Sequence, residues 1–393
     1  MRILILSFSP IARDPRVQRQ IRALRSGHEL IVAGFSPISE DDTQMIAIGR
    51  RPPSLGWKVL AFLTLLCGRY GLHYWFQLEY PRRAMQQLEA GNFDLVLAND
   101  VNTLPLAFRL ADGAPVYLDA HEFSPAEFLS LRWRLSLGRL YHWICGRWLA
   151  HVSVMSTVCG GISDLYASSY GRPADLIVLN VPPLLPLEAP VNLSGQKLDQ
   201  TIRLVHHGAA IPERLLELMV QMLNFLDPRF TLDFFLVGAD SAYARALPQH
   251  CSNPARLRLN HPVPMAQLPQ TLSRFDIGIF LLPPVNLNYQ YALPNKLFEF
   301  LHAGLAIAIG PSPEMAAIVR SEEVGVVAPS FEPAALAACL NALQPEQIRQ
   351  FRRNAWAARQ RYSSQAAEQA IAASVNRAMN LQGVSMPINE RVT

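Results

Sequence analysis

The beginning of the chain, residues 1–34, constrains the fold more than any other part of the sequence. Residues 2–7 are a short, continuous apolar run, typical of a strand buried in a parallel sheet. Asp14 and Pro15 then indicate a helix start, and Gly27 indicates its end. A second apolar run follows at residues 29–34. Strand, helix and strand at this spacing predict a βαβ unit and hence an α/β fold with a parallel sheet.

The same alternation continues along the chain in two series. The first adds expected strands at residues 94–98, 116–119 and 152–156. The second has expected strands at residues 202–207, 231–237, 257–259, 277–281, 306–309 and 325–327. We therefore expect two doubly wound, Rossmann-like domains at residues 1–180 and 201–362 and a linker at 181–200. Residues 363–393 are expected to form a helix that packs back on the first domain, followed by a tail.

Composition excludes several classes of protein. Half of the 393 residues are hydrophobic and 17% are charged, which is too apolar for a disordered chain. The net charge of +4 suits an anionic small substrate or a lipid surface, and is too small for a dedicated nucleic-acid binder. Five widely spaced cysteines favour reduced thiols over disulfides or a zinc site, and no signal peptide is recognisable, so we expect a cytoplasmic protein.

Several motifs at expected strand ends and helix starts resemble those of one enzyme family. They are residues 14–17, 20–21, 23–24, 27–28, 99–100, 103–105, 119–122, 293–300 and 303–305. In this order they resemble bacterial GT-B glycosyltransferases of the family 4-like, or group 1, type. The resemblance implies two domains facing a central cleft and the transfer of a sugar from a UDP- or GDP-sugar to a glycan, lipid-linked or small-molecule acceptor. It also implies retention of configuration, no metal or other cofactor, and a role in cell-envelope or exopolysaccharide biosynthesis.

Two basic residues of the second domain are candidates for stabilising the leaving diphosphate. Preorganised cations and backbone N–H groups best stabilise the charge that develops on such a group. Arg214 lies at the expected start of a helix that follows a strand, and Lys296 opens a later helix. The resemblance implies that both hold the diphosphate. The alternatives are a solvated arginine in a first helical turn and a lysine on a surface helix.

The motif around Lys296 supplies further candidates. Glu299 is embedded in an apolar run, so its carboxylate needs a partner. The resemblance implies that it accepts hydrogen bonds from the ribose hydroxyls of the nucleotide, and the alternative is a structural ion pair. Leu293, Pro294 and Asn295, in the same motif, are expected to line the substrate site.

Three other positions of the second domain are weaker candidates. Gly208 closes a strand, either where the backbone approaches a ligand closely or as an ordinary turn glycine. Val263 lies in a segment that contacts the nucleobase in the family. Tyr291 stands where many relatives carry a glutamate near the reacting sugar, so the chain departs from the family there. The nearby polar residues that could replace it are Asn288, Tyr289 and Gln290.

The first domain also carries candidates at strand ends. Asp119 and His121 follow one expected strand, and the resemblance implies that the histidine hydrogen-bonds the donor sugar or the diphosphate; the alternative is a structural histidine. Asp100 either belongs to the site or caps the next helix. Arg13 is expected near a phosphate or the acceptor. The loop at residues 7–14 lacks G-x-G-x-x-G, which argues against a dehydrogenase.

Two segments of the first domain, residues 54–76 and 128–148, mix leucine, aromatic and basic side chains. Such helices either lie on an anionic membrane, here the inner face of the plasma membrane, or pack into the domain with extended arginines. Basic residues interrupt the first segment, which makes it a poor membrane span.

Two other functions fit the same architecture. One is a nucleotide-sugar epimerase, which needs no acceptor. The other is a non-catalytic partner subunit that resembles a glycosyltransferase, for which Tyr291 is the main support.

Overall fold

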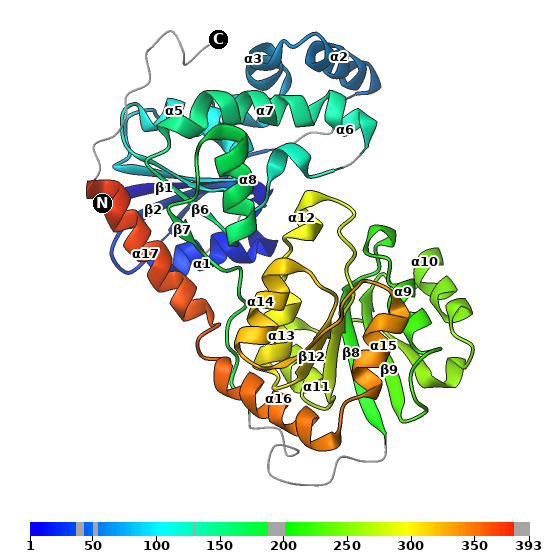
Figure 1. Cartoon of the computed structure of the whole chain (residues 1–393). Helices are drawn as coiled ribbons and strands as arrows, with labels where there is room; N and C mark the ends of the chain where they lie inside the picture. Colours follow the sequence, from blue (N-terminus) through cyan, green and yellow to red (C-terminus); the bar gives the residue numbers. More distant parts are fainter. Residues whose placement is uncertain (37–42, 50–53, 129, 188–200, 381–393) are drawn as a thin grey trace. The chain divides into compact units, whose positions relative to one another are not determined.

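The computed structural model describes residues 1–36, 43–49, 54–128, 130–187 and 201–380 (Figure 1). It divides into two compact units. Unit 1 comprises Met1–Leu179, Asn286–Asn288 and the chain from Gln365 onward, and unit 2 comprises Asn180–Val285 and Tyr289–Ser364. Residues 188–200 of the predicted linker, residues 381–393 of the predicted tail and residue 129 of the segment 128–148 lie outside the described residues.

Unit 1 is built on a seven-stranded parallel sheet with the order β3-β2-β1-β4-β5-β6-β7. Its strands are β1 (Arg2–Pro10), β2 (Glu29–Phe35), β3 (Thr43–Ala47), β4 (Leu95–Asn99), β5 (Val116–Asp119), β6 (Val154–Thr157) and β7 (Leu176–Ile177). Its helices are α1 (Pro15–Leu24), α2 (Leu55–Leu66), α3 (Tyr70–Leu72), α4 (Glu79–Gln87), α5 (Leu104–Ala111), α6 (Leu131–Leu135), α7 (Leu137–Trp148), α8 (Gly160–Tyr170) and α17 (Ser364–Asn380).

Unit 2 contains a six-stranded parallel sheet with the order β10-β9-β8-β11-β12-β13. Its strands are β8 (Ile202–Ala209), β9 (Phe230–Val237), β10 (Leu257–Asn260), β11 (Ile277–Phe280), β12 (Ala306–Ile309) and β13 (Gly325–Val327). Its helices are α9 (Glu217–Met222), α10 (Ala242–Ala246), α11 (Leu268–Leu272), α12 (Leu287–Gln290, shared with unit 1), α13 (Asn295–His302), α14 (Pro313–Ser321), α15 (Pro333–Asn341) and α16 (Pro345–Ala358). The two parallel sheets with interleaved helices confirm the predicted α/β class and its two Rossmann-like domains.

The start of α1 shows how local sequence sets an element. The side chain of Asp14 accepts hydrogen bonds from the backbone N–H groups of Arg16 and Val17, and Pro15 occupies the first helical position. Both features satisfy the free donors of a helix start. The predicted N-cap is confirmed, and it places Asp14 and Arg16 beside the carboxyl end of β1.

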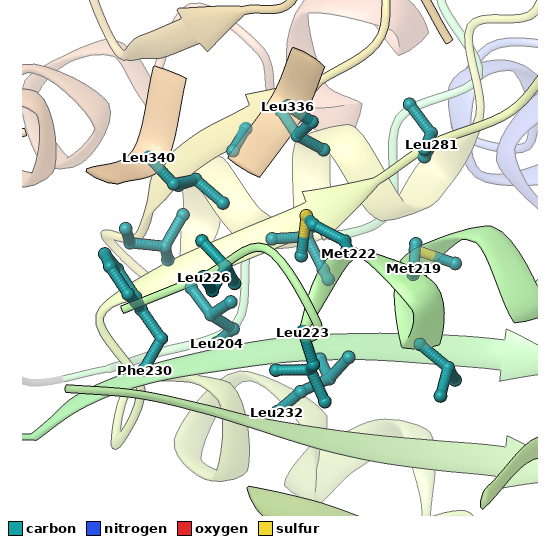
Figure 2. Close-up of a cluster of buried hydrophobic side chains, with 14 of the residues drawn as sticks. Leu204, Met219, Met222, Leu223, Leu226, Phe230, Leu232, Leu281, Leu336 and Leu340 are labelled. Carbon is teal, nitrogen blue, oxygen red and sulfur yellow. The ribbon is translucent and has the colours of Figure 1, made fainter. Parts of the chain in front are cut away.

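Two central strands of unit 2, β11 and β12, are buried on both faces. Ile277 and Ile279 of β11 belong to the core that α9 and α15 cover, together with Leu204 of β8 and Leu232 of β9 (Figure 2). Gly278, between the two isoleucines, points the other way, because side chains alternate along a strand. A Cβ on Gly278 would lie 2.4 Å from the ring of Phe300, so this glycine lets α13 pack directly on β11.

One predicted helix is wrong in detail. Arg214 was expected at the start of a helix, but it ends a 3-10 turn (Pro212–Arg214) that is separated from α9 by Leu215, whose φ is +49°. The hydroxyl of Tyr243 accepts a hydrogen bond from the backbone N–H of Leu216 (2.8 Å), which satisfies a donor freed by this break. Arg214 therefore precedes α9 and does not lie in its first turn.

Candidate active site

In each sheet, the strand order reverses direction at one position, where a ligand site is expected. The chain leaves β8 toward β9 and β10 and then returns to β11 on the other side of β8. In open α/β sheets, ligands bind beyond the carboxyl ends of the strands at such a reversal. In unit 2 this position is at the ends of β8 and β11. In unit 1 the same reversal lies between β1 and β4.

Lys296, in the first turn of α13, extends to the ends of β8 and β11, where the strand order of unit 2 reverses. Its side chain is buried, with Nζ 3.9 Å from the centre of the Phe280 ring and 3.3 Å from Nε2 of His206. Burial, and then the nearby Arg214, hold the pKa of Lys296 well below its usual value, while Glu299 acts in the opposite direction. Burial makes the charged form of Lys296 unfavourable. An anionic ligand beside Nζ would offset this cost, so the position is suited to such a ligand.

Arg214 approaches the same point from the loop after β8. A Cβ built on Gly208 would lie 3.3 Å from Nζ of Lys296 and 3.4 Å from Nη1 of Arg214, so the two cationic tips converge beside this glycine. The φ of Gly208 is +131°, which favours glycine. Among the described residues, the guanidinium group of Arg214 has no hydrogen-bond or ion-pair partner. Two basic side chains that meet beside a glycine have the charge and the space that a doubly charged anion needs.

Glu299 lies one turn after Lys296 on α13. Its carboxylate is buried, and Oε2 lies 3.1 Å from Nε2 of His207, at an angle outside that of a hydrogen bond. The ring of His207 also meets the ring of Phe300 edge-on. Both histidines come from the end of β8, so consecutive residues of this strand contact the two charged residues of α13.

The start of α13 provides more polar groups. Oδ1 of Asn295 is buried and has no hydrogen-bond partner among the residues described. Pro294 occupies the N-cap position and makes no side-chain cap, which leaves the first backbone N–H groups of the helix available. Leu293 is buried, and Pro294 and Asn295 are half-buried. The motif 293–299 therefore lies with Gly208 and Arg214 at the end of β8.

The remaining candidates of unit 2 lie outside this cluster. Val263 is half-buried in the segment after β10, two strands away from β8. Tyr291 is half-buried between α12 and α13. Asn288 belongs to unit 1, where its Oδ1 accepts a hydrogen bond from the backbone N–H of Phe123 (2.8 Å).

In unit 1, Asp119 lies in a buried polar network at the end of β5. Oδ2 accepts a hydrogen bond from Nε2 of Gln20 (2.9 Å), and Oδ1 accepts one from the hydroxyl of Ser156 (3.3 Å). Gln20 also exchanges hydrogen bonds with Asn99. Burial is the main cause that raises the pKa of Asp119. Its carboxylate links β5, β6 and α1.

Asp100 pairs with Arg16 at the reversal in unit 1. The guanidinium donates two hydrogen bonds to the carboxylate, at 2.9 and 3.0 Å. The Asp100 side chain makes no cap to the following turn. Asp100 has a φ of +63° and His121 a φ of +51°, both in the positive-φ region that residues other than glycine adopt uncommonly. Such backbone strain is concentrated at functional sites, which supports both residues as candidates.

Titratable groups collect after β5. Burial, and then Arg16, hold the pKa of His121 well below its usual value, so its imidazole is neutral. Burial raises the pKa of Glu127 to about 7, with Glu122 and Asp100 adding to the effect. Glu127 was not predicted, because nothing in its sequence surroundings indicates burial. Arg13 is exposed and forms no hydrogen bond with these groups.

Three contributors in unit 2 were also missed: His206, His207 and Phe280. Two consecutive histidines on an apolar strand were the available signal for the first two. In the described part of the chain, no three His, Cys, Asp or Glu side chains are grouped to hold a metal ion.

No family model matches this sequence, and no curated protein matches it. Solved structures do match. HepE from Anabaena, in complex with UDP-glucose, is 17% identical with a TM-score of 0.68, over 96% of this chain and 99% of that one. Sucrose-phosphate synthase from Thermosynechococcus elongatus is 13% identical with a TM-score of 0.71, over 97% and 99%.

A third match is an α,α-trehalose-phosphate synthase (UDP-forming) from Burkholderia vietnamiensis, which is 12% identical with a TM-score of 0.65, over 96% of this chain and 100% of that one. At these identities the likeness concerns the fold. It extends over nearly the whole chain in each case and agrees with the two parallel sheets described above. The protein has the two-domain GT-B fold of these solved structures.

Proposed function

We propose that this protein is a glycosyltransferase that moves a sugar from a nucleotide-diphosphate sugar to an acceptor, with retention of configuration. The observation that carries the proposal is the convergence of Nζ of Lys296 and Nη1 of Arg214 beside Gly208. HepE was solved with UDP-glucose, and the trehalose-phosphate synthase is described as UDP-forming. We therefore infer a UDP-sugar as the donor.

The chemistry follows from the charge on the leaving group. The bond between the anomeric carbon and the diphosphate oxygen breaks, and its electron pair stays with the diphosphate. Arg214 and Lys296 stabilise the charge that develops there, helped by the backbone N–H groups at the start of α13. The oxygen of the acceptor hydroxyl then bonds to the anomeric carbon on the face that the diphosphate leaves, and the hydroxyl proton passes to the departing diphosphate oxygen.

The nucleoside is bound by other residues of α13 and by the segment after β10. The carboxylate of Glu299, whose Oε2 lies 3.1 Å from Nε2 of His207, accepts hydrogen bonds from the ribose hydroxyls. The free Oδ1 of Asn295 accepts a hydrogen bond from a hydroxyl group of the donor. Val263, beyond β10, contacts the base.

In unit 1, we propose that the strained residues Asp100 and His121 recognise the sugar or the acceptor. The acceptor belongs to the glycan, lipid-linked or small-molecule class, and with a glycan or lipid-linked acceptor the enzyme would help to make the cell envelope or an exopolysaccharide. Peripheral contact with an anionic membrane would bring the enzyme to a lipid-linked acceptor.

A thermal-shift screen tests the donor site. UDP should raise the melting temperature by mass action, and more than GDP or ADP does. The shift should vanish in Arg214→Ala and Lys296→Ala, while Arg245→Ala, which removes an exposed arginine of the same unit, should behave as wild type. The same variants should lose release of UDP from a panel of UDP-sugars. If no nucleotide shifts the wild-type protein, the proposed function is wrong.

A further inference from the structure

Helix α2 contradicts the usual relation between composition and burial. Of its 12 residues, Lys58 is the only charged one and Thr64 the only polar one apart from a glycine. A helix that is apolar on every side is normally buried. In α2, however, only Thr64 and Leu65 are buried.

The exposed side chains of α2 belong to one larger surface of unit 1. Most of the exposed large apolar side chains among the described residues lie on α2, in the turns after it, and around α6. We call these the apolar surface: Leu55, Trp57, Val59, Leu60, Phe62, Leu63, Leu66, Leu72, Phe76, Phe128 and Leu131. Leu55 is 79% exposed, Leu131 68% and Phe76 62%. Large apolar side chains exposed in this number on one unit of a soluble protein normally have a function.

The apolar surface is held in place by the fold. Nε1 of Trp57 donates to the backbone carbonyl of Gln77 (3.2 Å), and Nε2 of Gln77 donates to the hydroxyl of Thr64 (2.6 Å). The rings of Tyr70 and Trp143 then join the segment to α7. Figure 1 shows α2 and α3 on the outer side of α7. The apolar surface is therefore a built feature of unit 1.

The charges around the apolar surface distinguish between possible partners. Residues 54–78 and 130–163 contain no aspartate or glutamate. Lys58 and Arg69 are exposed beside α2, and Arg132, Arg134 and Arg139 are exposed on and after α6. A second copy meeting this surface about a two-fold axis would place like charges together. Apolar and aromatic side chains mixed with unopposed cations instead complement anionic lipid headgroups above an acyl layer.

We propose that the apolar surface docks unit 1 on an anionic bilayer, with α2 lying in the plane of the interface. None of the helices in the described ranges is long and apolar enough to cross a membrane. At 1.5 Å per residue, α2 is about 18 Å long, well short of the roughly 30 Å of the hydrocarbon core. Its apolar side chains enter the upper acyl region while Lys58, Arg132 and Arg134 meet the headgroups. This inference stands whether or not the protein transfers sugars.

Vesicle co-sedimentation tests the proposal with the full chain. Vesicles of phosphatidylcholine with phosphatidylglycerol should pellet the protein, and vesicles of phosphatidylcholine alone should pellet much less of it. The double variant Leu63→Gln, Phe76→Gln should lower the binding constant for the anionic vesicles by about tenfold or more. The triple variant Lys58→Gln, Arg132→Gln, Arg134→Gln should also lower it and should remove most of its salt dependence.

The matched control is Ile177→Gln, Phe225→Gln, which removes two exposed apolar side chains outside the apolar surface and should leave binding unchanged. All these side chains are exposed, so melting temperatures should stay near that of wild type, which is checked for each variant. The proposal is overturned if wild type stays in the supernatant with both kinds of vesicle, or if Leu63→Gln, Phe76→Gln binds as wild type does. It is also overturned if the purified chain forms a dimer that this double variant dissociates, since the surface would then be an interface between copies.

Discussion

Nε2 of His206 lies 3.3 Å from Nζ of Lys296, while Nδ1 of the same ring lies 3.0 Å from the backbone carbonyl oxygen of Ile279. A carbonyl oxygen only accepts, so the proton of the neutral imidazole is on Nδ1 and Nε2 is left as an acceptor. Burial, and then Lys296, hold the pKa of His206 well below its usual value, which keeps the ring neutral. His206 thus orients the ammonium group without competing for the anion.

His206→Phe tests this positioning role. Phenylalanine suits the space between the rings of Phe234 and Phe280 but cannot accept a hydrogen bond. The affinity for UDP should fall by roughly tenfold, the effect of losing one hydrogen bond to a charged group. Calorimetric titration measures it. The exposed His250→Phe is the control and should leave the affinity unchanged; equal affinities in all three proteins would show that His206 does not act on Lys296.

Lys296→Met should stabilise the empty protein while weakening UDP binding. Because the pKa of Lys296 is lowered in the folded state, the unfolded chain binds more protons between the folded and unfolded pKa values. Lys296 therefore destabilises the fold increasingly as pH falls below about 10, and methionine removes this penalty. The melting temperature near pH 7 should rise by a few degrees, which differential scanning calorimetry can check. A lower melting temperature would show that the buried lysine supports the fold.

The lowered pKa of Lys296 also predicts proton uptake on binding. An anion beside Nζ favours the charged amine and raises its pKa. At about pH 8 both phosphates of UDP are ionised before and after binding. Any protons taken up on binding are therefore bound by the protein. Titrations in buffers of different ionisation enthalpy should reveal this uptake in wild type. Lys296 is the source of the proton uptake if Arg245→Ala still takes up protons and Lys296→Met, where it still binds UDP, takes up none. Equal binding heats for wild type in all buffers would contradict this role of Lys296.

Gly208→Ala and Gly238→Ala separate backbone strain from blockage of the site. Both glycines have positive φ, +131° and +82°, so alanine should cost each about 1 kcal/mol or more of stability. A Cβ on Gly208 would sit between the two cations, whereas one on Gly238 approaches only Ala210, at 4.0 Å. UDP binding should therefore be lost in Gly208→Ala and kept in Gly238→Ala. Thermal shift with UDP measures both effects, and retained binding in Gly208→Ala would place the anion elsewhere.

Much of the fold could be predicted because its signals are local. Asp14 and Pro15 mark the start of α1 by capping chemistry, and the buried strands of parallel sheets appear as continuous apolar runs. Strand β3 was missed because none of Thr43–Ala47 is buried, which leaves no apolar run to recognise. The break at Leu215 was also missed, since the hydroxyl that supports it belongs to Tyr243, far along the chain.

The candidate site was only partly predictable for the same reason. The motif around Lys296 could be recognised from its resemblance and from the helix start. The contacts of His206 with Lys296 and of His207 with Glu299 join residues about 90 positions apart, and depend on how α13 packs against β8. That packing in turn depends on Gly278, whose missing side chain makes room for Phe300. None of these relationships is visible in one segment of the sequence alone.

The most direct test of the central claim compares the affinities of UDP and uridine by calorimetric titration. If Arg214 and Lys296 hold a diphosphate, wild type should bind UDP far more tightly than uridine. Arg214→Ala and Lys296→Ala should each weaken UDP binding by about tenfold or more and leave uridine binding unchanged. Equal losses for both ligands, or no loss in either variant, would contradict the claim that these two cations bind the phosphates.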